Sequence, residues 1–314
     1  MLILAGDVGG TKTHLALYDG KECLRDEKYL SREYRNLSDI IKRFLPDKIK
    51  VARACFGVAG PVHEGISRTT NLPWTIESQK IAQELSIEKV WLINDLVATA
   101  WGIRCLKPDE IATLNVGKSR KGNRALIAAG TGLGEAGMIW EGASHLPFAS
   151  EGGHADFAPR DDKEKELWKY LKKKYGHVSK ERVVSGPGLE HLYWFLIESG
   201  RSHDRVQGDV LPKVIVEKGI SGESRTCREA LDWFVSLYAS AAGDLALTFL
   251  AYGGVYLGGG IAPRIISLLQ SESFMKSFRN KGRMDATLDE IPVRVILNDN
   301  AALLGAAEFA NLQE

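Results

Sequence analysis

The stretch LILAGDVGGTKTHLALYDG, residues 2–20, decides the fold. Its apolar start at residues 2–7 predicts a strand, and residues 13–20 predict a second strand. Between them, the glycines at positions 9 and 10 predict a tight hairpin turn. Dense glycine beside a strand pair indicates a turn whose backbone approaches another group closely.

The same strand, glycine turn and strand return at RALIAAGTGLGEAGMIW, residues 124–140, which predicts two related halves. Between these hairpins we expect a helix near Asn36–Phe44, a strand at 51–60, a loop at 61–65, a polar strand through 69–76 and a helix at 78–87. A further strand at 89–93 then runs directly into an apolar helix. Alternating strands and helices of this kind predict an α/β fold, with sheets covered by helices.

The chain of 314 residues exceeds what one hydrophobic core usually organises, so two domains are expected. The charged segment Lys107–Arg124 is predicted to join them. This gives a smaller α/β domain at residues 1–106, joined by a C-terminal helix at about 299–314, and a larger α/β domain at 107–298. A net charge of +1 argues against nucleic acid or an anionic membrane as a partner.

The four cysteines lie far apart without a CxxC pair, so neither a structural zinc site nor a disulfide framework is expected. Too few apolar residues precede Asp7 for a signal peptide, and a reducing cytoplasm fits. The uncharged stretch Leu245–Pro263 is long enough to span a bilayer, but it contains five glycines. We therefore interpret it as a buried helix, a short strand and a glycine turn.

The first glycine turn has the composition of an anion-binding loop. Gly9 and Gly10 remove side chains, so that successive amides can point at one oxyanion, while Thr11 adds a hydroxyl and Lys12 a cation. Asp7, at the end of the strand, is placed to hold Mg²⁺ through water. The alternative is an ordinary type I′ hairpin turn without a ligand. The GxxxxGK[ST] spacing of a Walker A loop is absent.

Two further glycine turns follow strands, GTGLG at residues 130–134 and LGGGIAP at 257–263. Each is weak alone, and GTGLG lacks the GxGxxG spacing of a dinucleotide fold. Together with the first turn, they suggest one nucleotide held between two domains.

Polar residues at two other places suggest sugar phosphorylation. Asp95 follows a strand and opens a helix, where it could cap that helix or accept a hydroxyl proton during phosphoryl transfer. Glu151 and His154 flank two glycines, and this pair suits recognition of neighbouring sugar hydroxyls. A purely structural loop is the alternative there.

The following segment combines a helix and a polar turn. Residues 163–175 predict a helix whose lysines form a solvated face. Glu181 lies in a polar turn, and Ser185 is predicted to cap the next helix. On that helix, Glu190 and His191 are expected to be exposed.

Six segments in order along nearly the whole chain resemble bacterial glucokinases of the actin-like sugar kinase superfamily. They are GDVGGTKT and AGTGLG as phosphate loops, LINDL with the catalytic aspartate, EGGHADFAP and GHVSKERVVSGPGLEHLY as sugar-binding and lid segments, and LGGGIAP as the adenosine loop. The resemblance implies a two-domain actin-like ATPase (ribonuclease H-like) fold with a central cleft that closes over the sugar. It also implies ATP with Mg²⁺, a cytoplasmic enzyme and a homodimer.

Carried over by motif, the resemblance makes Asp95 the general base that helps move the ATP γ-phosphate to the 6-hydroxyl of glucose. It assigns the glucose hydroxyls to Asn94, Glu151, His154 and Glu181. The residues expected to contact the nucleotide are Gly6, Asp7, Gly9, Gly10, Thr11, Lys12, Gly130, Thr131, Gly132, Gly258, Gly259 and Gly260.

One departure from the family pattern concerns the sugar. Lys12 stands where these glucokinases often carry asparagine. In having lysine there, the chain resembles the related repressor and sugar-kinase group. That group's cysteine-rich zinc motif is absent, and no helix-turn-helix precedes the first strand. The alternatives are a kinase for another hexose or an N-acetyl sugar, a sugar-sensing regulator without enzymatic activity, and an actin-like assembly protein.

Overall fold

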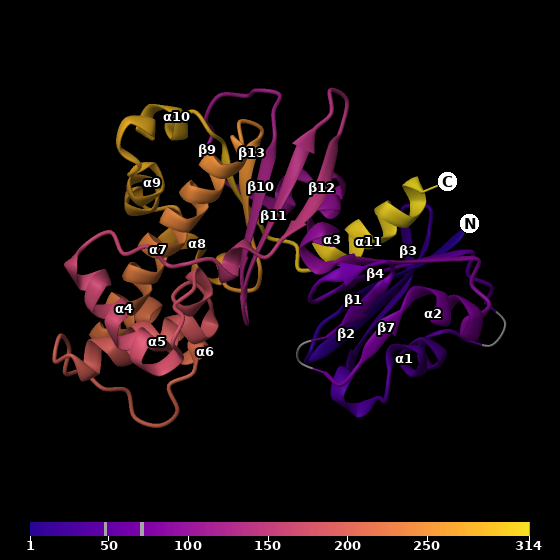
Figure 1. Ribbon diagram of the computed structural model, residues 1–314, viewed down its shortest axis with the longest axis horizontal. Helices are drawn as coiled ribbons and strands as arrows, with labels where there is room; N and C mark the ends of the chain where they lie inside the picture. The colour runs from indigo at the N-terminus through magenta and orange to yellow at the C-terminus, as the bar shows by residue number, and fades with distance from the viewer. Residues whose placement is uncertain (47–48, 70–71, 314) are drawn as a thin grey trace. The chain divides into compact units, whose positions relative to one another are not determined.

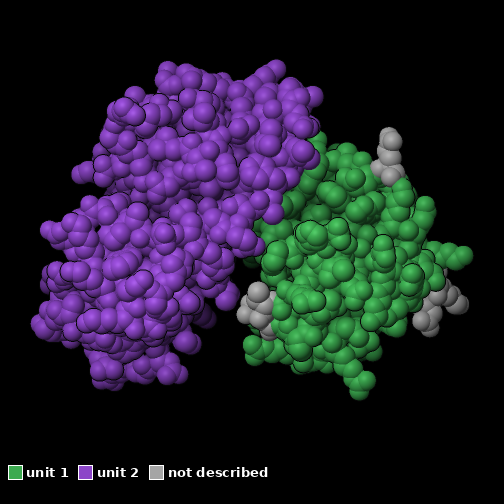
Figure 2. All heavy atoms as spheres, viewed as in Figure 1, with its two compact units in different colours: residues 1–110, 298–314 green, residues 111–297 purple. Residues whose placement is uncertain are grey.

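A computed structural model of the chain describes residues 1–46, 49–69 and 72–313 (Figure 1). These residues form two compact units (Figure 2). Unit 1 combines Met1–Glu110 with Asn298–Glu314, and unit 2 is Ile111–Leu297. Each unit contains a β-sheet and several helices, so the predicted mixed α/β class is confirmed.

Unit 1 is built on a five-stranded sheet in the order β3-β2-β1-β4-β8. Its strands are β1 (Leu2–Val8), β2 (Lys12–Asp19), β3 (Glu22–Leu30), β4 (Arg53–Val58) and β8 (Lys89–Asn94). The β1–β2 and β2–β3 pairs are antiparallel, whereas β4 runs parallel to both β1 and β8. The predicted N-terminal hairpin is confirmed, with Val8 opposite Thr13 at its turn.

Apart from the edge strand β3, which is mostly exposed, both faces of this sheet are buried, because alternate residues of its strands enter two different cores. Leu4 and Phe56 pack on one face with α1 and α2, while Ile3 and Cys55 pack on the other face with α3 and α11. These helices are α1 (Leu37–Phe44), α2 (Ser78–Leu85), α3 (Asp95–Gly102) and α11 (Ala301–Leu312). The last of them brings the end of the chain back to the first strands.

The segment after β4 is more ordered than the predicted loop at residues 61–65. It begins a small sheet in the order β5-β6-β7, made of β5 (Val62–His63), β6 (Ile66–Arg68) and β7 (Thr75–Glu77). Glu64 and Gly65 form the turn with positive φ angles of 50° and 74°. In the polar strand predicted through residues 69–76, positions 70 and 71 lie outside the described residues.

Unit 2 is built on a six-stranded sheet in the order β12-β11-β10-β13-β14-β9. Its strands are β9 (Ile111–Asn115), β10 (Arg124–Ala129), β11 (Leu133–Trp140), β12 (His145–Ser150), β13 (Gly254–Gly258) and β14 (Val293–Ile296). Two antiparallel pairs precede two parallel pairs, in the same order as in unit 1. The prediction of two related halves is confirmed.

The predicted joint Lys107–Arg124 contains a strand that we did not expect. Residues 111–115 form β9, which pairs antiparallel with β14 at the edge of the unit 2 sheet. The Asn115 side chain donates hydrogen bonds to the carbonyls of Asp289 and Ile291, at 2.9 and 2.8 Å. Contacts with residues near the end of unit 2 therefore fix this strand, and no local pattern in the sequence predicts these contacts.

The helices of unit 2 pack around one large core centred on the long helix α7. They are α4 (Asp162–Tyr175), α5 (Gly186–Glu198), α6 (Pro212–Ser221), α7 (Arg225–Phe249), α8 (Ile266–Leu269), α9 (Glu272–Arg279) and α10 (Asp285–Asp289). The interpretation of Leu245–Pro263 is confirmed, since it comprises the end of α7, strand β13 and a turn. Over the ranges that the structure covers, none of the helices is both long and apolar enough to cross a bilayer.

Helices α3 and α11 touch backbone to backbone, and this contact gives a test of unit 1. A Cβ added at Gly305 would overlap the carbonyl oxygen of Ala98, and one at Gly102 would overlap that of Ala301. We expect Gly305→Ala to lower the free energy of unfolding by about 1–3 kcal/mol, because overpacking forces the helices apart. Denaturant unfolding followed by tryptophan fluorescence measures the loss.

Asn311→Ala is the control for this prediction. Asn311 is exposed on the same helix, so its change should stay within about 0.5 kcal/mol of wild type. Equal stability of Gly305→Ala and wild type would contradict the tight crossing.

Candidate active site

The first glycine turn, between β1 and β2, is closed by the Gly9 amide, which donates to the Lys12 carbonyl at 3.0 Å. Ser31, fully buried, donates its hydroxyl to the Gly9 carbonyl at 2.8 Å and its amide to the Thr11 carbonyl at 3.0 Å. The amides of Gly10 and Thr11 donate to no residue in the described part of the chain. These two consecutive amides are thus available to an anion, whereas the Gly9 amide is used within the turn.

The turn is not of type I′, the conformation considered for a turn without a ligand. That type needs positive φ angles at both central residues, and neither Gly10 nor Thr11 has one. The side chains of Thr11 and Lys12 are exposed. Gly6 is needed for packing, because a Cβ there would lie 2.5 Å from the Phe56 ring.

Asp7 is a partly buried carboxylate near the end of β1. Burial raises the pKa of Asp7, while the neighbouring His14 and Lys28 side chains lower it. No described residue forms a hydrogen bond or an ion pair with this side chain. Such a carboxylate fits nucleotide-bound Mg²⁺, which needs one or two protein carboxylates because phosphates and water supply its other ligands. Within the described ranges, no three His, Cys, Asp or Glu side chains gather as a metal site.

The structure at the junction of β8 and α3 bears on the two roles that the sequence left open for Asp95, as a helix cap or as the acceptor of a hydroxyl proton. Asn94 is the N-cap, since its Oδ1 accepts from the amides of Leu96 and Val97 at 2.9 and 3.2 Å. Its Nδ2 donates to the Gly60 carbonyl at 3.3 Å. Asp95 is the first residue of α3, and its carboxylate shares the Leu96 amide at 2.9 Å. The helix therefore does not need Asp95 as its cap.

The second glycine turn, between β10 and β11, repeats the features of the first. The Gly130 amide donates to the Gly132 carbonyl at 2.9 Å, and the Gly130 carbonyl accepts from the Gly186 amide at 2.8 Å. The amides of Thr131 and Gly132 have no acceptor among the residues described. Each of the two related halves thus offers a pair of consecutive unpaired amides at the turn of its first hairpin.

The third glycine turn follows β13 and lies directly beside the second. Gly259 has a φ of +80°, and a Cβ there would overlap the carbonyl of Ala129, the residue before Gly130. The Ile261 amide donates to the same carbonyl at 3.2 Å. Gly258 ends β13 and is buried, whereas Gly259 and Gly260 are exposed.

Three of the predicted sugar-binding residues form one cluster in unit 2, which we call the sugar cluster: Glu151, His154 and Glu181. His154 lies between the two carboxylates, with Nε2 3.9 Å from Glu151 Oε2 and Nδ1 4.0 Å from Glu181 Oε1. Glu151 and His154 are about 60% exposed, and Glu181 is 26% exposed. The predicted pairing of carboxylate and imidazole is therefore present and open to a ligand. Asn94 and Asp95 belong to unit 1.

The backbone of Leu133, at the start of β11, holds both halves of this cluster. Its amide donates to Glu181 Oε2 at 3.0 Å. A Cβ at Gly153 would overlap the Leu133 carbonyl, so the loop that carries Glu151 and His154 rests on that carbonyl. A Cβ at Gly132 would lie 2.5 Å from Glu181 Oε2. The glycines of both segments therefore allow close approach within the site.

The helix after Glu181 begins as predicted, but neither residue expected to be exposed on it is exposed, since Glu190 is partly buried and His191 is buried. Ser185 caps α5 by accepting from the Gly188 amide at 3.0 Å, and it donates to the Glu181 carbonyl at 2.7 Å. The expectation that His191 is exposed is wrong, because this side chain is 7% exposed and burial lowers its pKa. It contacts the Tyr175 hydroxyl at 2.7 Å and the Arg182 carbonyl at 2.8 Å, so it supports the turn that holds Glu181.

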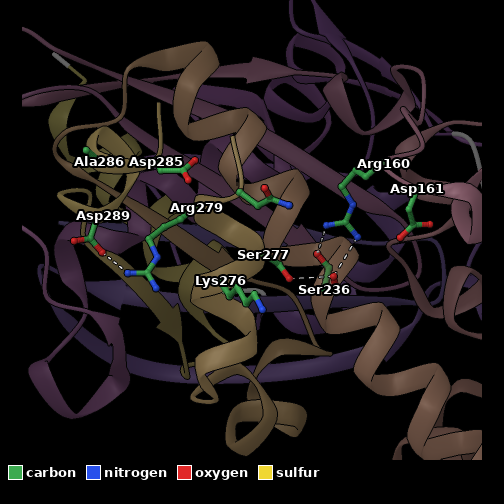
Figure 3. Close-up of a pocket in the computed structure, with 10 residues that line it drawn as sticks. Arg160, Asp161, Ser236, Lys276, Ser277, Arg279, Asp285, Ala286 and Asp289 are labelled. Atoms are coloured by element: carbon green, nitrogen blue, oxygen red, sulfur yellow. Dashed lines mark hydrogen bonds and ion pairs between the residues drawn. The ribbon is translucent and has the colours of Figure 1, made fainter. Parts of the chain in front are cut away.

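A polar pocket of about 760 Å³ elsewhere in unit 2 contains no predicted site residue (Figure 3). Two of its cations are already paired, Arg160 with Glu164 and Arg279 with Asp289. Figure 3 also shows Ser236 bonded to Arg160 and to Ser277. None of the residues that line the pocket belongs to the sugar cluster.

Comparisons with known proteins identify the family of the chain. The sequence profile of the family described as Glucokinase matches residues 4–313. A glucokinase from Trichormus variabilis is 40% identical, and the match covers 98% of each chain. The crystal structure of a glucokinase from an Antarctic psychrotroph has a TM-score of 0.86 and 32% identity, over 99% of both chains.

A more distant solved structure shares the fold. It is a ROK family glucokinase from Streptomyces griseus in complex with glucose and AMPPNP, with a TM-score of 0.68 and 20% identity over the full length of both chains. The profile match over nearly the whole chain, together with the close relatives, settles the family. The chain belongs to the glucokinase family.

Proposed function

We propose that this protein transfers the γ-phosphate of ATP to the 6-hydroxyl of glucose, which yields glucose 6-phosphate and ADP. The observation that carries the proposal is the sugar cluster of Glu151, His154 and Glu181, tied to the second glycine turn through Leu133. Carboxylate and imidazole groups suit the hydroxyls of a hexose. Membership of the glucokinase family supports glucose as that hexose.

In this proposal Asp95 is the general base. Its carboxylate lies at the N-terminus of α3, where it accepts a hydrogen bond from the Leu96 amide at 2.9 Å. Phosphoryl transfer passes through a loose transition state, so the base mainly orients the hydroxyl and takes its proton late. The side-chain amide of Asn94, the residue before Asp95, would bind a hydroxyl of the sugar.

The nucleotide is assigned to the three glycine turns. The unpaired amides of Gly10 and Thr11, and those of Thr131 and Gly132, suit phosphate oxygens, and Lys12 adds a positive charge. Gly258, Gly259 and Gly260 would face the adenosine. Asp7 would hold Mg²⁺ through water, and that ion would help to neutralise charge on the phosphates.

The strand order shared by units 1 and 2 supports the actin-like ATPase fold with a central cleft. We infer that residues 1–106 with 299–314 and residues 107–298 act as domains that close over the sugar. Closure would exclude water and so limit wasteful hydrolysis of ATP. From the family resemblance we also infer a homodimer in the cytoplasm.

An ADP-release assay over a panel of hexoses and N-acetyl hexoses tests the function. We expect ADP release only when sugar is present, with the highest kcat/KM for glucose. ATP hydrolysis that does not depend on sugar would contradict the proposal. A preference for an N-acetyl sugar would contradict the assignment of glucose while retaining the kinase.

Asp95→Asn tests the general base. The substitution keeps the shape of the side chain, so glucose and ATP should still bind, whereas turnover should fall by about 10²- to 10⁴-fold. Asp162→Asn is a matched control, because Asp162 is also the first residue of a helix that another residue caps, and its side chain is 92% exposed. Near-normal turnover of Asp95→Asn would contradict the mechanism.

Asp7→Asn tests the site of Mg²⁺. Because burial raises the pKa of Asp7, its ionised form costs folding free energy at neutral pH. The variant should therefore be at least as stable as wild type at pH 7, with a difference in Tm that shrinks as the pH falls and the carboxyl becomes protonated. The kinase activity of Asp7→Asn should fall by about 10- to 100-fold, or the Mg²⁺ concentration that it needs should rise by the same factor. A titration of activity with Mg²⁺ measures both.

Asp19→Asn is the control for Asp7→Asn. Asp19 lies in the same hairpin, and its exposed carboxylate pairs with the N-terminal amine at 2.8 Å. Its loss should leave activity unchanged. An Asp7→Asn enzyme with wild-type Mg²⁺ dependence would remove Asp7 from the proposed site.

A further inference from the structure

Behind the sugar cluster lies an ion pair that the proposed chemistry does not use. Glu135 Oε1 on β11 is 3.1 Å from Lys180 Nζ, and the two side chains are 2% and 20% exposed. Removing charges from water is costly, so a buried ion pair is often no more stable than an apolar pair of similar size. Stability alone therefore gives little reason for a carboxylate at this position.

The carboxylate of Glu135 supports the loop that carries Glu151 and His154. A Cβ added at Gly152 would overlap Glu135 Oε2, so the backbone of this loop lies directly on the carboxylate. The Gly152 amide donates to Ser150 Oγ at 2.9 Å, which fixes the beginning of the loop. A displacement of the Glu135 side chain would leave the loop without its support.

Lys180 supports the other half of the cluster. It immediately precedes Glu181 in a short turn, and its amide donates to the Ala155 carbonyl at 2.9 Å, directly after His154. An isolated bridge between Asp156 and Ser179 continues this contact. One ion pair thus connects β11 with both segments of the sugar cluster.

Charge gives a second reason for the pair. Glu151 and Glu181 already place two carboxylates in the cluster, and Glu135 adds a third carboxylate behind them. Asp244, from α7, adds negative potential at Glu135, although it is itself paired with Lys281 at 2.7 Å. The ammonium of Lys180 offsets this charge at the point where the segments meet.

We propose that Glu135 and Lys180 form a positioning pair that holds Glu151 and His154 at the separation from Glu181 that glucose requires. The pair acts through these three residues and does not touch the reacting atoms. The inference rests on the proposed function, because it assumes that the sugar cluster binds glucose.

Lys180→Met and Glu135→Gln test the pair in the full-length protein. We expect both variants to bind glucose about tenfold more weakly, measured by calorimetry without ATP, because small displacements of binding groups have large effects. In steady-state kinetics the KM for glucose should rise, while kcat and the KM for ATP stay near their wild-type values. Lys180→Arg keeps the positive charge and should retain most of the affinity for glucose.

A double variant separates positioning from stability. Each single variant leaves one buried charge without its partner and should lower the Tm. Glu135→Leu with Lys180→Met replaces both charges by apolar side chains, so the Tm of the double variant should be close to that of wild type, while its affinity for glucose stays low. Lys163→Met is the control, since it breaks the more exposed Lys163–Glu229 pair, which lies at 3.2 Å. It should bind glucose as wild type does.

Two results would overturn the proposal: wild-type affinity in Lys180→Met, or recovery of both stability and affinity in the double variant. Equal losses in Lys180→Arg and Lys180→Met would contradict the role of charge. If the wild-type protein itself does not bind glucose, the proposed function fails, and the variants are not needed to show it.

Discussion

The hydrogen bond from the Leu133 amide to Glu181 is the contact on which the candidate site depends. Leu133 is the first residue of β11, so the register of the unit 2 sheet sets its position. Its carbonyl supports Gly153, and its neighbour Gly132 belongs to the second glycine turn. A single peptide segment thus links the residues assigned to the sugar with those assigned to phosphate, and a shift of β11 would move both.

The two halves of the chain present the same arrangement of backbone amides. The net charge of the protein is +1, so no strong overall field attracts an anion. Each half places two adjacent amides at the turn of a hairpin, and both hairpins start a sheet with the same strand order. In the proposed function, these backbone amides rather than a basic surface would provide most of the attraction for phosphate.

Local features of the sequence predicted most of this architecture. The hairpins, the start of α1 at Asn36 and the cap of α5 at Ser185 depend on neighbouring residues, and the structure has them where they were expected. The joint at 107–124 was less predictable, because β9 depends on pairing with β14, which lies at Val293–Ile296, far along the chain. Local sequence could not supply that partner.

Side-chain environments were harder to predict than elements. His191 is polar and follows a glutamate, which suggests surface, yet the Tyr175 hydroxyl and the Arg182 carbonyl enclose it. Glu135 gave one signal, as a lone charge within the small and apolar residues of β11. Its partner Lys180 is 45 residues away in the sequence, and only the folded chain shows that they meet.

Because α11 covers one face of the unit 1 sheet, the two units become complete at different times during synthesis. Residues 1–110 leave the ribosome with Ile3, Cys55 and their neighbours lacking this cover. Unit 2 has all of its strands and helices before residues 301–312 are made. The N-terminal unit therefore completes its core last, against the usual order of domain folding, and one apolar face of its sheet stays uncovered until α11 is made.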